Sequence, residues 1–108
     1  MQNPKSAGMI GLAAKAGKVS SGEFSAERAI SSGKAGLCIV AENASENTRK
    51  HFHDMCSYRG IRIVDSDVPK SSLGHMIGKK DRAVITIDDP GFSKTIINII
   101  EGGRANGE

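Results

Sequence analysis

Apolar residues along the chain follow two spacings: one repeats with the turn of an α-helix, and the other forms short unbroken runs. The helical spacing, bounded by glycine, proline or serine, predicts helices over residues 4–16, 20–32, 45–59, 71–78 and 89–101. Extended segments are predicted over residues 18–20, 37–41, 61–64 and 83–87. Because strands and helices alternate, we expect an α/β protein with helices on both faces of a sheet, a three-layer α/β/α sandwich.

Local signals predict the ends and the buried faces of three of these helices. Ser20 and Glu23 have the spacing of a capping box, which predicts that the second helix begins just after Ser20. Ser45 is expected to cap the third helix. The apolar stripe of the third helix consists of Thr48, Phe52, Met55 and Cys56. The final helix is expected to face the core through Phe92, Ile96, Ile97 and Ile100.

The length of 108 residues fits one domain, which we place at residues 1–101, followed by a flexible tail at residues 102–108. No apolar run is long enough to span a membrane, and the first residues do not form a convincing export signal. We therefore expect a cytoplasmic protein. Cys38 and Cys56 are accordingly expected to be reduced thiols, with Cys38 buried in a strand.

Charge points weakly to an anionic partner, since the net charge is +3 and the isoelectric point is about 9.0. The distribution is more informative than the sum. Basic residues gather at 15–18, at Arg28 and Lys34, and at 79–82, whereas acidic residues gather at 65–67 and 88–89. If the basic groups share one face, the protein has the footprint of a nucleic-acid-binding protein.

No motif for catalysis is evident in the sequence. The segment from Gly11 to Lys18 is nearest to a phosphate-binding loop, but its glycines are one residue too far apart and Val19 replaces the required hydroxyl. His75 has no evident nucleophile or orienting partner, and the paired carboxylates at 65–67 and 88–89 suit turns and helix caps. We therefore predict no catalytic residue, no cofactor and no small-molecule substrate.

A metal site is also not predicted. His51, His53 and Cys56 lie close together on the third helix, but the two histidines diverge by about 200° around a helix. They are therefore expected to flank the apolar stripe as surface residues, with Cys56 inside the stripe.

The remaining signal lies in the second helix. Its buried face is predicted to consist of Ala26, Ala29 and Ile30, which places Phe24 and Arg28 on the opposite side. An exposed ring can stack on an unpaired base while the guanidinium pairs with a phosphate, and the helix start offers N–H groups. In the alternative interpretation, Phe24 folds back onto the preceding loop or the neighbouring helix.

Several longer motifs resemble one known family. The segments AENASENTRK, SLGHMIGK and DDPGFSK, with the run from GKVSSGEF onward, are similar to the kink-turn-binding ribosomal-protein superfamily of the L-seven-Ae and L-thirty-e types. The resemblance is strongest to its short bacterial YlxQ-like branch and covers about Gly11 to Lys94. It implies a four-stranded mixed sheet and RNA binding without catalysis. It also implies contact through the start of the second helix and a loop near the fourth helix and last strand.

The resemblance also assigns residues. The family pattern G-x-N-E-x-x-K falls on residues 22–28, where Gly22 matches and Arg28 keeps the positive charge, while Phe24 and Ser25 replace the Asn and Glu that read sheared G·A pairs. RNA binding is therefore implied, and kink-turn selectivity is left open. The expected RNA-binding residues are Lys18, Gly22, Glu23, Phe24, Arg28, Lys34, Glu42, Asn43, Lys79, Lys80 and Arg82.

Two functions therefore remain in competition. The first is a monomeric RNA-binding protein of the ribosomal class, which binds structured RNA or ribosomal RNA in translation, in a ribonucleoprotein or as a ribosome accessory factor. The second is a protein-interaction module on the same fold that has lost kink-turn specificity. It would expose an apolar patch near Phe24 or Tyr58.

Overall fold

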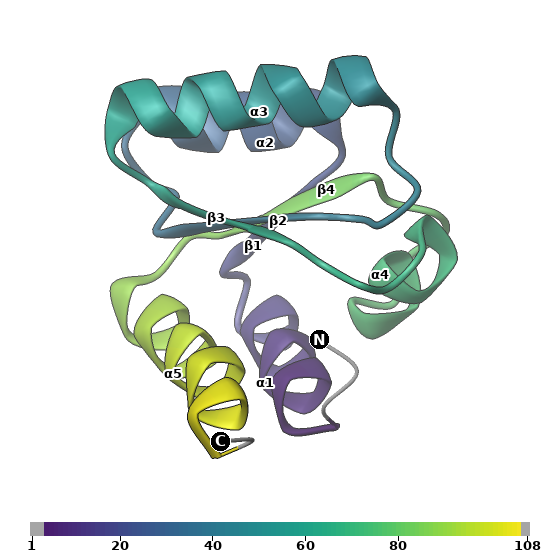
Figure 1. Cartoon of the computed structure of the whole chain (residues 1–108), viewed down its shortest axis with the longest axis vertical. Helices are drawn as coiled ribbons and strands as arrows, with labels where there is room; N and C mark the ends of the chain where they lie inside the picture. Colours follow the sequence, from purple (N-terminus) through teal and green to yellow (C-terminus); the bar gives the residue numbers. More distant parts are fainter. Residues whose placement is uncertain (1–3, 107–108) are drawn as a thin grey trace.

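A four-stranded mixed sheet forms the centre of the molecule (Figure 1). The structure, a computed structural model, describes the backbone of residues 4–106 and the side chains of residues 4–102. The strand order is β1-β4-β2-β3, with bounds β1 Val19–Ser21, β4 Val84–Ile87, β2 Leu37–Val40 and β3 Arg62–Asp65. The two pairs that involve β4 are antiparallel, and β2 and β3 are parallel. The mixed sheet implied by the resemblance is therefore confirmed.

Helices cover both faces of this sheet, which confirms the three-layer α/β/α sandwich (Figure 1). One face carries α2 (Glu23–Ser31) and α3 (Glu46–Arg59). The other face carries α1 (Pro4–Lys15), α4 (Lys70–Met76) and α5 (Pro90–Asn106). Within the described part of the chain, no helix is both long enough and apolar enough to cross a bilayer.

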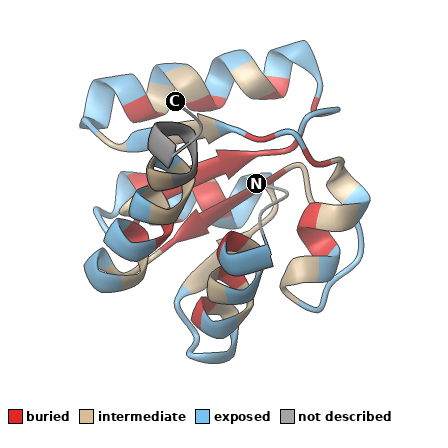
Figure 2. Cartoon of the chain, turned by 60° about the horizontal axis from the view of Figure 1, so that its bottom comes forward, coloured by how far each residue is buried: buried red, intermediate tan, exposed pale blue. Residues whose placement is uncertain are grey.

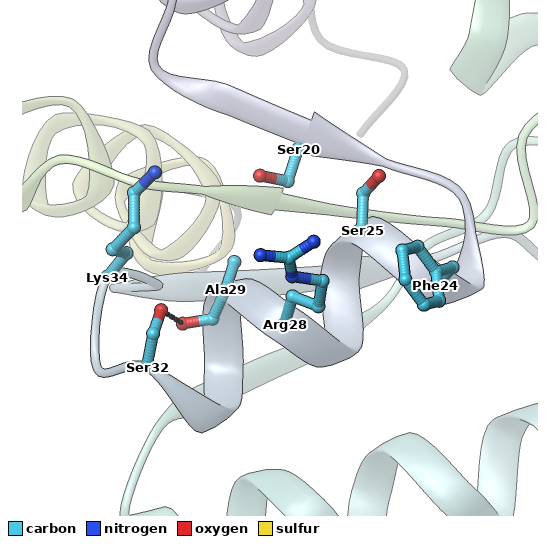
Figure 3. Close-up of a pocket in the computed structure, with 7 residues that line it drawn as sticks. All are labelled: Ser20, Phe24, Ser25, Arg28, Ala29, Ser32 and Lys34. Atoms are coloured by element: carbon cyan, nitrogen blue, oxygen red, sulfur yellow. Dashed lines mark hydrogen bonds between the residues drawn. The ribbon is translucent and has the colours of Figure 1, made fainter.

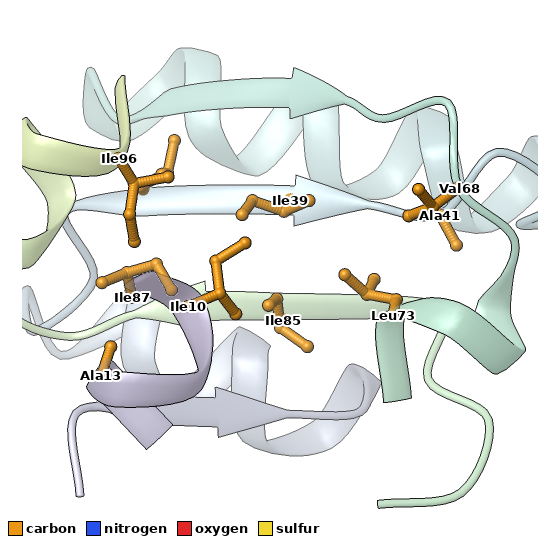
Figure 4. Close-up of a cluster of buried hydrophobic side chains, with 10 residues drawn as sticks. Ile10, Ala13, Ile39, Ala41, Val68, Leu73, Ile85, Ile87 and Ile96 are labelled. Carbon is orange, nitrogen blue, oxygen red and sulfur yellow. The ribbon is translucent and has the colours of Figure 1, made fainter. Parts of the chain in front are cut away.

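The core consists of two apolar clusters, one on each side of the sheet. Strands β2 and β4 are buried along their whole length, as Figure 2 shows in red, because helices cover them on both sides. Ile39 and Ile85 face the cluster beneath α1, α4 and α5 (Figure 4). Cys38 and Val84 face the cluster beneath α2 and α3. Successive side chains thus alternate between the two clusters, as the pleat of a strand requires.

The third helix follows its sequence signals closely. The Ser45 hydroxyl accepts a hydrogen bond from the backbone N–H of Thr48 at 3.1 Å, and the helix ends at Gly60 with a left-handed φ of 68°. Thr48, Phe52 and Cys56 are buried as predicted, and Met55 packs at the edge of the same cluster.

The start of the second helix differs from the prediction. The residue that precedes α2 is Gly22, and no side chain of residues 4–102 caps the helix. Ser20 lies instead in β1, where its hydroxyl donates to Asp88 Oδ2 at 2.6 Å, so the predicted capping box of Ser20 and Glu23 is wrong. Pairing of β1 with β4, a contact distant in sequence, outweighs the local capping signal.

The last helix is longer than expected. Its backbone is helical through Asn106, so it includes residues that we assigned to a tail at 102–108. Residues 107–108 lie outside the described part of the chain. Phe92, Ile96, Ile97 and Ile100 pack against the core as predicted.

The two cysteines lie inside the layer formed by β2 and α3, and both are free thiols. A hydrogen bond between Cys56 and Cys38, together with burial, raises the pKa of the Cys38 thiol well above its usual range. Cys38 therefore behaves as a small apolar core residue, as expected from its strand.

Candidate nucleic-acid interface

One edge of the sheet gathers segments that are distant in sequence. The register pairs Ser21 with Ile85, and Val40 with both Val84 and Asp65. The carboxyl ends of β1, β2 and β3 therefore lie beside the amino end of β4. This edge brings together the start of α2, the loop that precedes β4 and the loop that follows β2.

Gly22 turns the chain from β1 into α2. Its φ of 87° and ψ of 161° lie in a region that L side chains rarely adopt, so glycine is required there. The Gly22 N–H donates to the Val84 carbonyl oxygen at 3.0 Å, which fixes the helix start against β4. Among the described residues no side chain caps α2, so the N–H groups of its first turn have no side-chain acceptor there, and the helix dipole favours an anion at this end.

Phe24 and Arg28 lie on the outward face of α2, as the sequence predicts. The Phe24 side chain is 73% exposed, so it does not fold back into the core. The Arg28 guanidinium carbon lies 5.7 Å from the centre of the Phe24 ring, within the range of a cation–π interaction. Ala26, Ala29 and Ile30 form the buried face of the helix.

The segment 77–83, which we call the basic loop, carries the lysine pair Lys79 and Lys80. Gly78 has a left-handed φ of 73° and ends α4, and the Lys79 N–H donates to the Gly74 carbonyl oxygen at 2.9 Å. The backbone then folds back so closely that a β-carbon at Gly74 would overlap the Lys80 carbonyl oxygen. Lys79 and Lys80 are held on this turn with exposed side chains.

Arg82 ties this segment to the start of α2. Its Nε donates to the Ser21 hydroxyl at 3.0 Å, and its Nη1 donates to the Asp81 carbonyl oxygen at 2.9 Å. Its backbone N–H donates to the Lys70 carbonyl oxygen at 3.0 Å. Arg82 is therefore a tether between the loop, β1 and α4.

Glu42 and Asn43 follow β2 at the same edge of the sheet, where each accepts a hydrogen bond from another part of the chain. Asn43 Oδ1 accepts from the backbone N–H of Lys70 at 2.9 Å and so caps the start of α4 from a neighbouring loop. The Glu42 carbonyl oxygen accepts from Arg49 Nη2 at 2.8 Å. Arg49 also pairs with Asp65 at 2.9 Å, which links α3 to the ends of β2 and β3.

Two shallow hollows flank Phe24. The first, which we call the edge hollow, has a volume of about 520 Å³ and combines two cations with two carboxylates. Its lining residues are Ser21, Gly22, Glu23, Phe24, Ser25, Lys70, Asp81, Arg82 and Ala83. Lys70 was not among the residues expected from the sequence. Backbone hydrogen bonds with Asn43 and Arg82 hold it at this edge.

The second, which we call the helix hollow, follows the outward face of α2 and has a volume of about 350 Å³ (Figure 3). Its lining residues are Ser20, Phe24, Ser25, Arg28, Ala29, Ser32 and Lys34. Lys34 follows the carboxyl end of α2, yet it lines the same hollow as Phe24. Lys18 precedes β1, at the end of that strand opposite Gly22, and lines neither hollow.

The histidines of α3 bind different partners. His51 pairs with Glu27 of α2 at 3.2 Å, and His53 pairs with Asp65 of β3 at 2.8 Å. Burial tends to raise the pKa of Asp65, but hydrogen bonds from His53 and Arg49 outweigh it and lower that pKa. Across the part of the chain that the structure describes, no three His, Cys, Asp or Glu residues gather as metal ligands would.

Comparison with known proteins gives a consistent result. Residues 5–97 match the model of the ribosomal protein L7Ae/L30e/S12e/Gadd45 family. Two similar relatives are the RNA-binding protein YlxQ of Bacillus subtilis (strain 168) and that of Enterococcus faecium. The first is 36% identical over 86% of this chain and 92% of the relative, and the second is 39% identical over 91% and 93%. A solved structure of a protein with unknown function from Bacillus halodurans has a TM-score of 0.81 and 32% identity, and the match covers 90% of this chain and 97% of that one.

Proposed function

Because the chain belongs to the ribosomal protein L7Ae/L30e/S12e/Gadd45 family, we propose that it is a small RNA-binding protein that contacts structured RNA through the edge of its sheet. Two relatives that match nearly along their whole length are named as RNA-binding proteins. The chain is a binding protein of this family and not an enzyme. We further propose that it acts in the cytoplasm as a monomer, on ribosomal RNA or an RNA that folds similarly.

The observation that carries this proposal is the tether between the two segments of the edge. Arg82 of the basic loop donates to Ser21 at 3.0 Å, one residue before the Gly22 turn. This tether supports a single surface formed by the start of α2 and the lysine pair, which itself lines neither hollow. Peptide N–H groups at a helix start bind a phosphate oxygen, and lysine side chains neutralise neighbouring phosphates.

Phe24 and Ser25 determine what this surface recognises. The family pattern has Asn and Glu at these two positions, where amide and carboxylate groups hydrogen-bond to base edges. A phenylalanine ring offers a stacking surface instead, and serine has a short reach. We propose that the chain relies less on sheared G·A pairs and more on phosphates and an unpaired base.

One observation favours a second candidate, a protein-interaction module. The Tyr58 side chain on α3 is 87% exposed, and the Arg59 guanidinium lies 5.9 Å from its ring. Tyrosine and arginine are enriched at the energetic centres of protein interfaces. This pair lies on α3, whereas Phe24 lies on α2 and Gly22 just precedes it, so an RNA partner and a protein partner would bind through separate elements.

Filter binding to a panel of structured RNAs, a kink-turn among them, tests the proposal. Measured from about 50 to 200 mM salt, affinity for at least one RNA is expected to fall steeply, because bound phosphates release counterions. Failure to bind any RNA, combined with protein association that is insensitive to salt and lost in Tyr58→Ala, would favour the interaction module.

A further inference from the structure

Two thiols meet inside the layer between α3 and the sheet. Cys38 is the second residue of β2, and Cys56 lies in the last turn of α3, which lies above β2 and β3 in Figure 1. Both side chains are completely buried, and both belong to the cluster beneath α2 and α3. The pair lies near the amino ends of β2 and β3, away from the Gly22 turn, so it is separate from the surface proposed to bind RNA.

Backbone contacts bring the two cysteines together. The Ile61 N–H donates to the Cys56 carbonyl oxygen at 2.9 Å, which holds the end of α3 at the start of β3. Two residues further along the chain, Ile63 lies beside Cys38 in the parallel register of β3 and β2. Alternation along β2 turns the Cys38 side chain toward α3, on the same side as Val40. The two thiols therefore face each other, and they hydrogen-bond across the layer.

The hydrogen bond gives the two thiols different acidities. It lowers the pKa of Cys56, although burial acts in the opposite direction, and together with burial it raises the pKa of Cys38. The thiolate is the nucleophilic form of cysteine, so Cys56 is the reactive member of the pair and Cys38 is the protonated member. A reactive cysteine beside a second thiol that can resolve its oxidised form is typical of redox-sensing sites.

We infer that Cys38 and Cys56 form a reversible disulfide when the chain meets a peroxide. The Cys56 thiolate attacks one peroxide oxygen and the O–O bond breaks, so Cys56 becomes a sulfenic acid while the departing hydroxide takes up the proton that Cys56 released. The Cys38 sulfur then attacks the Cys56 sulfur. The S–S bond forms, the S–O bond breaks, and hydroxide leaves with the Cys38 proton as water.

The reaction balances without any further reactant. Two thiols and one hydrogen peroxide give one disulfide and two water molecules, and two electrons pass from the sulfurs to the peroxide. A dithiol reductant returns both cysteines to thiols by thiol–disulfide exchange. The inference goes beyond RNA binding and does not depend on it.

Access to the buried pair depends on the last turn of α3. Residues 57–59 follow Cys56 with exposed side chains, and Gly60 ends the helix. Helix ends open locally far more often than a whole chain unfolds, so peroxide reaches Cys56 when this turn opens. Closure then returns the modified sulfur to Cys38. Because opening precedes the chemical step, the rate of oxidation is expected to level off as the peroxide concentration rises.

Peptide mapping of the full chain, after exposure to hydrogen peroxide without denaturant, tests the inference. Trypsin cleaves after Lys34, Arg49, Lys50 and Arg59, so peptides 35–49 and 51–59 carry one cysteine each. We expect mass spectrometry to find these two peptides joined, two hydrogen atoms lighter than their sum, and separated again by dithiothreitol. Free thiols under conditions that oxidise glutathione, or disulfides that join two chains, would overturn the inference.

Alanine variants separate the roles of the two thiols. In Cys38→Ala, the sulfenic acid at Cys56 has no second thiol to resolve it and is expected to be captured by dimedone. In Cys56→Ala, the remaining Cys38 is expected to stay unmodified over the same time. Capture at Cys38 instead of Cys56 would overturn the inference.

The outcome does not depend on the folding of these variants. Peptide mapping of the parent chain requires no substitution, so it decides the result if either variant fails to fold. RNA binding of the reduced chain is measured separately, by filter binding. A chain that binds RNA but forms no disulfide would overturn this inference alone, and a chain that forms the disulfide but binds no RNA would overturn the proposed function alone.

Discussion

The Lys80 carbonyl oxygen rests against Gly74 with no room for a β-carbon between them. This contact requires glycine in a buried turn of α4, because any side chain would push the basic loop outward. The position of the basic loop is thus set by a residue that lines neither hollow.

Gly74→Ala is the first test of this relationship. Overpacking is expected to lower the free energy of unfolding by about 1–3 kcal/mol and to displace the segment 77–83, which weakens RNA binding. Chemical denaturation and filter binding measure the two effects. Gly8→Ala on α1, where the added carbon meets open space, is the matched control and is expected to stabilise by about 0.5–1 kcal/mol. Equal stability of the two variants would contradict the assigned contact.

The lysine pair is expected to contribute to affinity through phosphates. Lys79→Ala combined with Lys80→Ala should weaken binding of every tested RNA by a similar factor, about tenfold at low salt, and reduce the salt slope by about 2. The control removes the same charge through Lys15→Ala and Lys94→Ala, on α1 and α5. If the control pair weakened binding as much, net charge rather than the loop would be responsible.

Restoring the family pattern is expected to change specificity. Phe24→Asn with Ser25→Glu introduces groups that hydrogen-bond to base edges at exposed positions, so the fold is retained. Affinity for a kink-turn should rise about tenfold relative to the same RNA with its G·A pairs replaced by Watson–Crick pairs. The added carboxylate repels RNA in general, so a gain limited to the G·A-containing RNA cannot come from charge. Equal affinities for the two RNAs would show that these positions do not read G·A pairs here.

Asn43 is expected to stabilise the edge through α4. Asn43→Ala removes the acceptor for the Lys70 N–H and should cost about 1 kcal/mol, while Asn43→Asp keeps an acceptor and should retain most of the stability. Urea denaturation measures both. Asn47→Ala, an exposed change on α3, serves as the control and should stay within about 0.5 kcal/mol of the parent protein. A cost at Asn47 as large as that at Asn43 would argue against the cap.

Stability at acid pH is expected to depend on Asp65. Its folded-state pKa is lowered by His53 and Arg49 against the opposing effect of burial, so the unfolded chain binds the proton more tightly. The contribution is fully present above the ordinary pKa of about 3.9 and is lost as the pH falls through the lower folded value. Denaturation of the parent and of Asp65→Asn from pH about 5 to about 2 should therefore show a stability gap that closes on acidification. A gap that stays constant would mean that the carboxylate charge is not its cause.

Much of the fold follows from the sequence because its signals are local. The runs around Cys38 and Ile85 predict buried strands, Ser45 and Gly60 define α3, and the helical spacing correctly places Phe24 outward. These features depend on residues a few positions apart, which the chain itself specifies.

The features that the sequence did not predict depend on contacts between distant segments. Ser20 has a capping spacing, yet its place in β1 depends on a partner in β4 that lies 66 residues further along the chain, Thr86. Arg82 is expected from the sequence to bind RNA, which stays a prediction, but nothing local in the sequence indicates its hydrogen bond to Ser21. Lys70 gives no signal of its own, since only the packing of α4 brings it to the edge.

The buried face and the outward face of α2 have different roles. Ala26, Ala29 and Ile30 anchor the helix, whereas Phe24 and Ser25 make no contribution to either core cluster. Residues on the outward face can therefore change without disturbing either core cluster. The same scaffold thus tolerates different surface chemistry at Phe24 and Ser25, where a ring and a hydroxyl are displayed at no cost to the core.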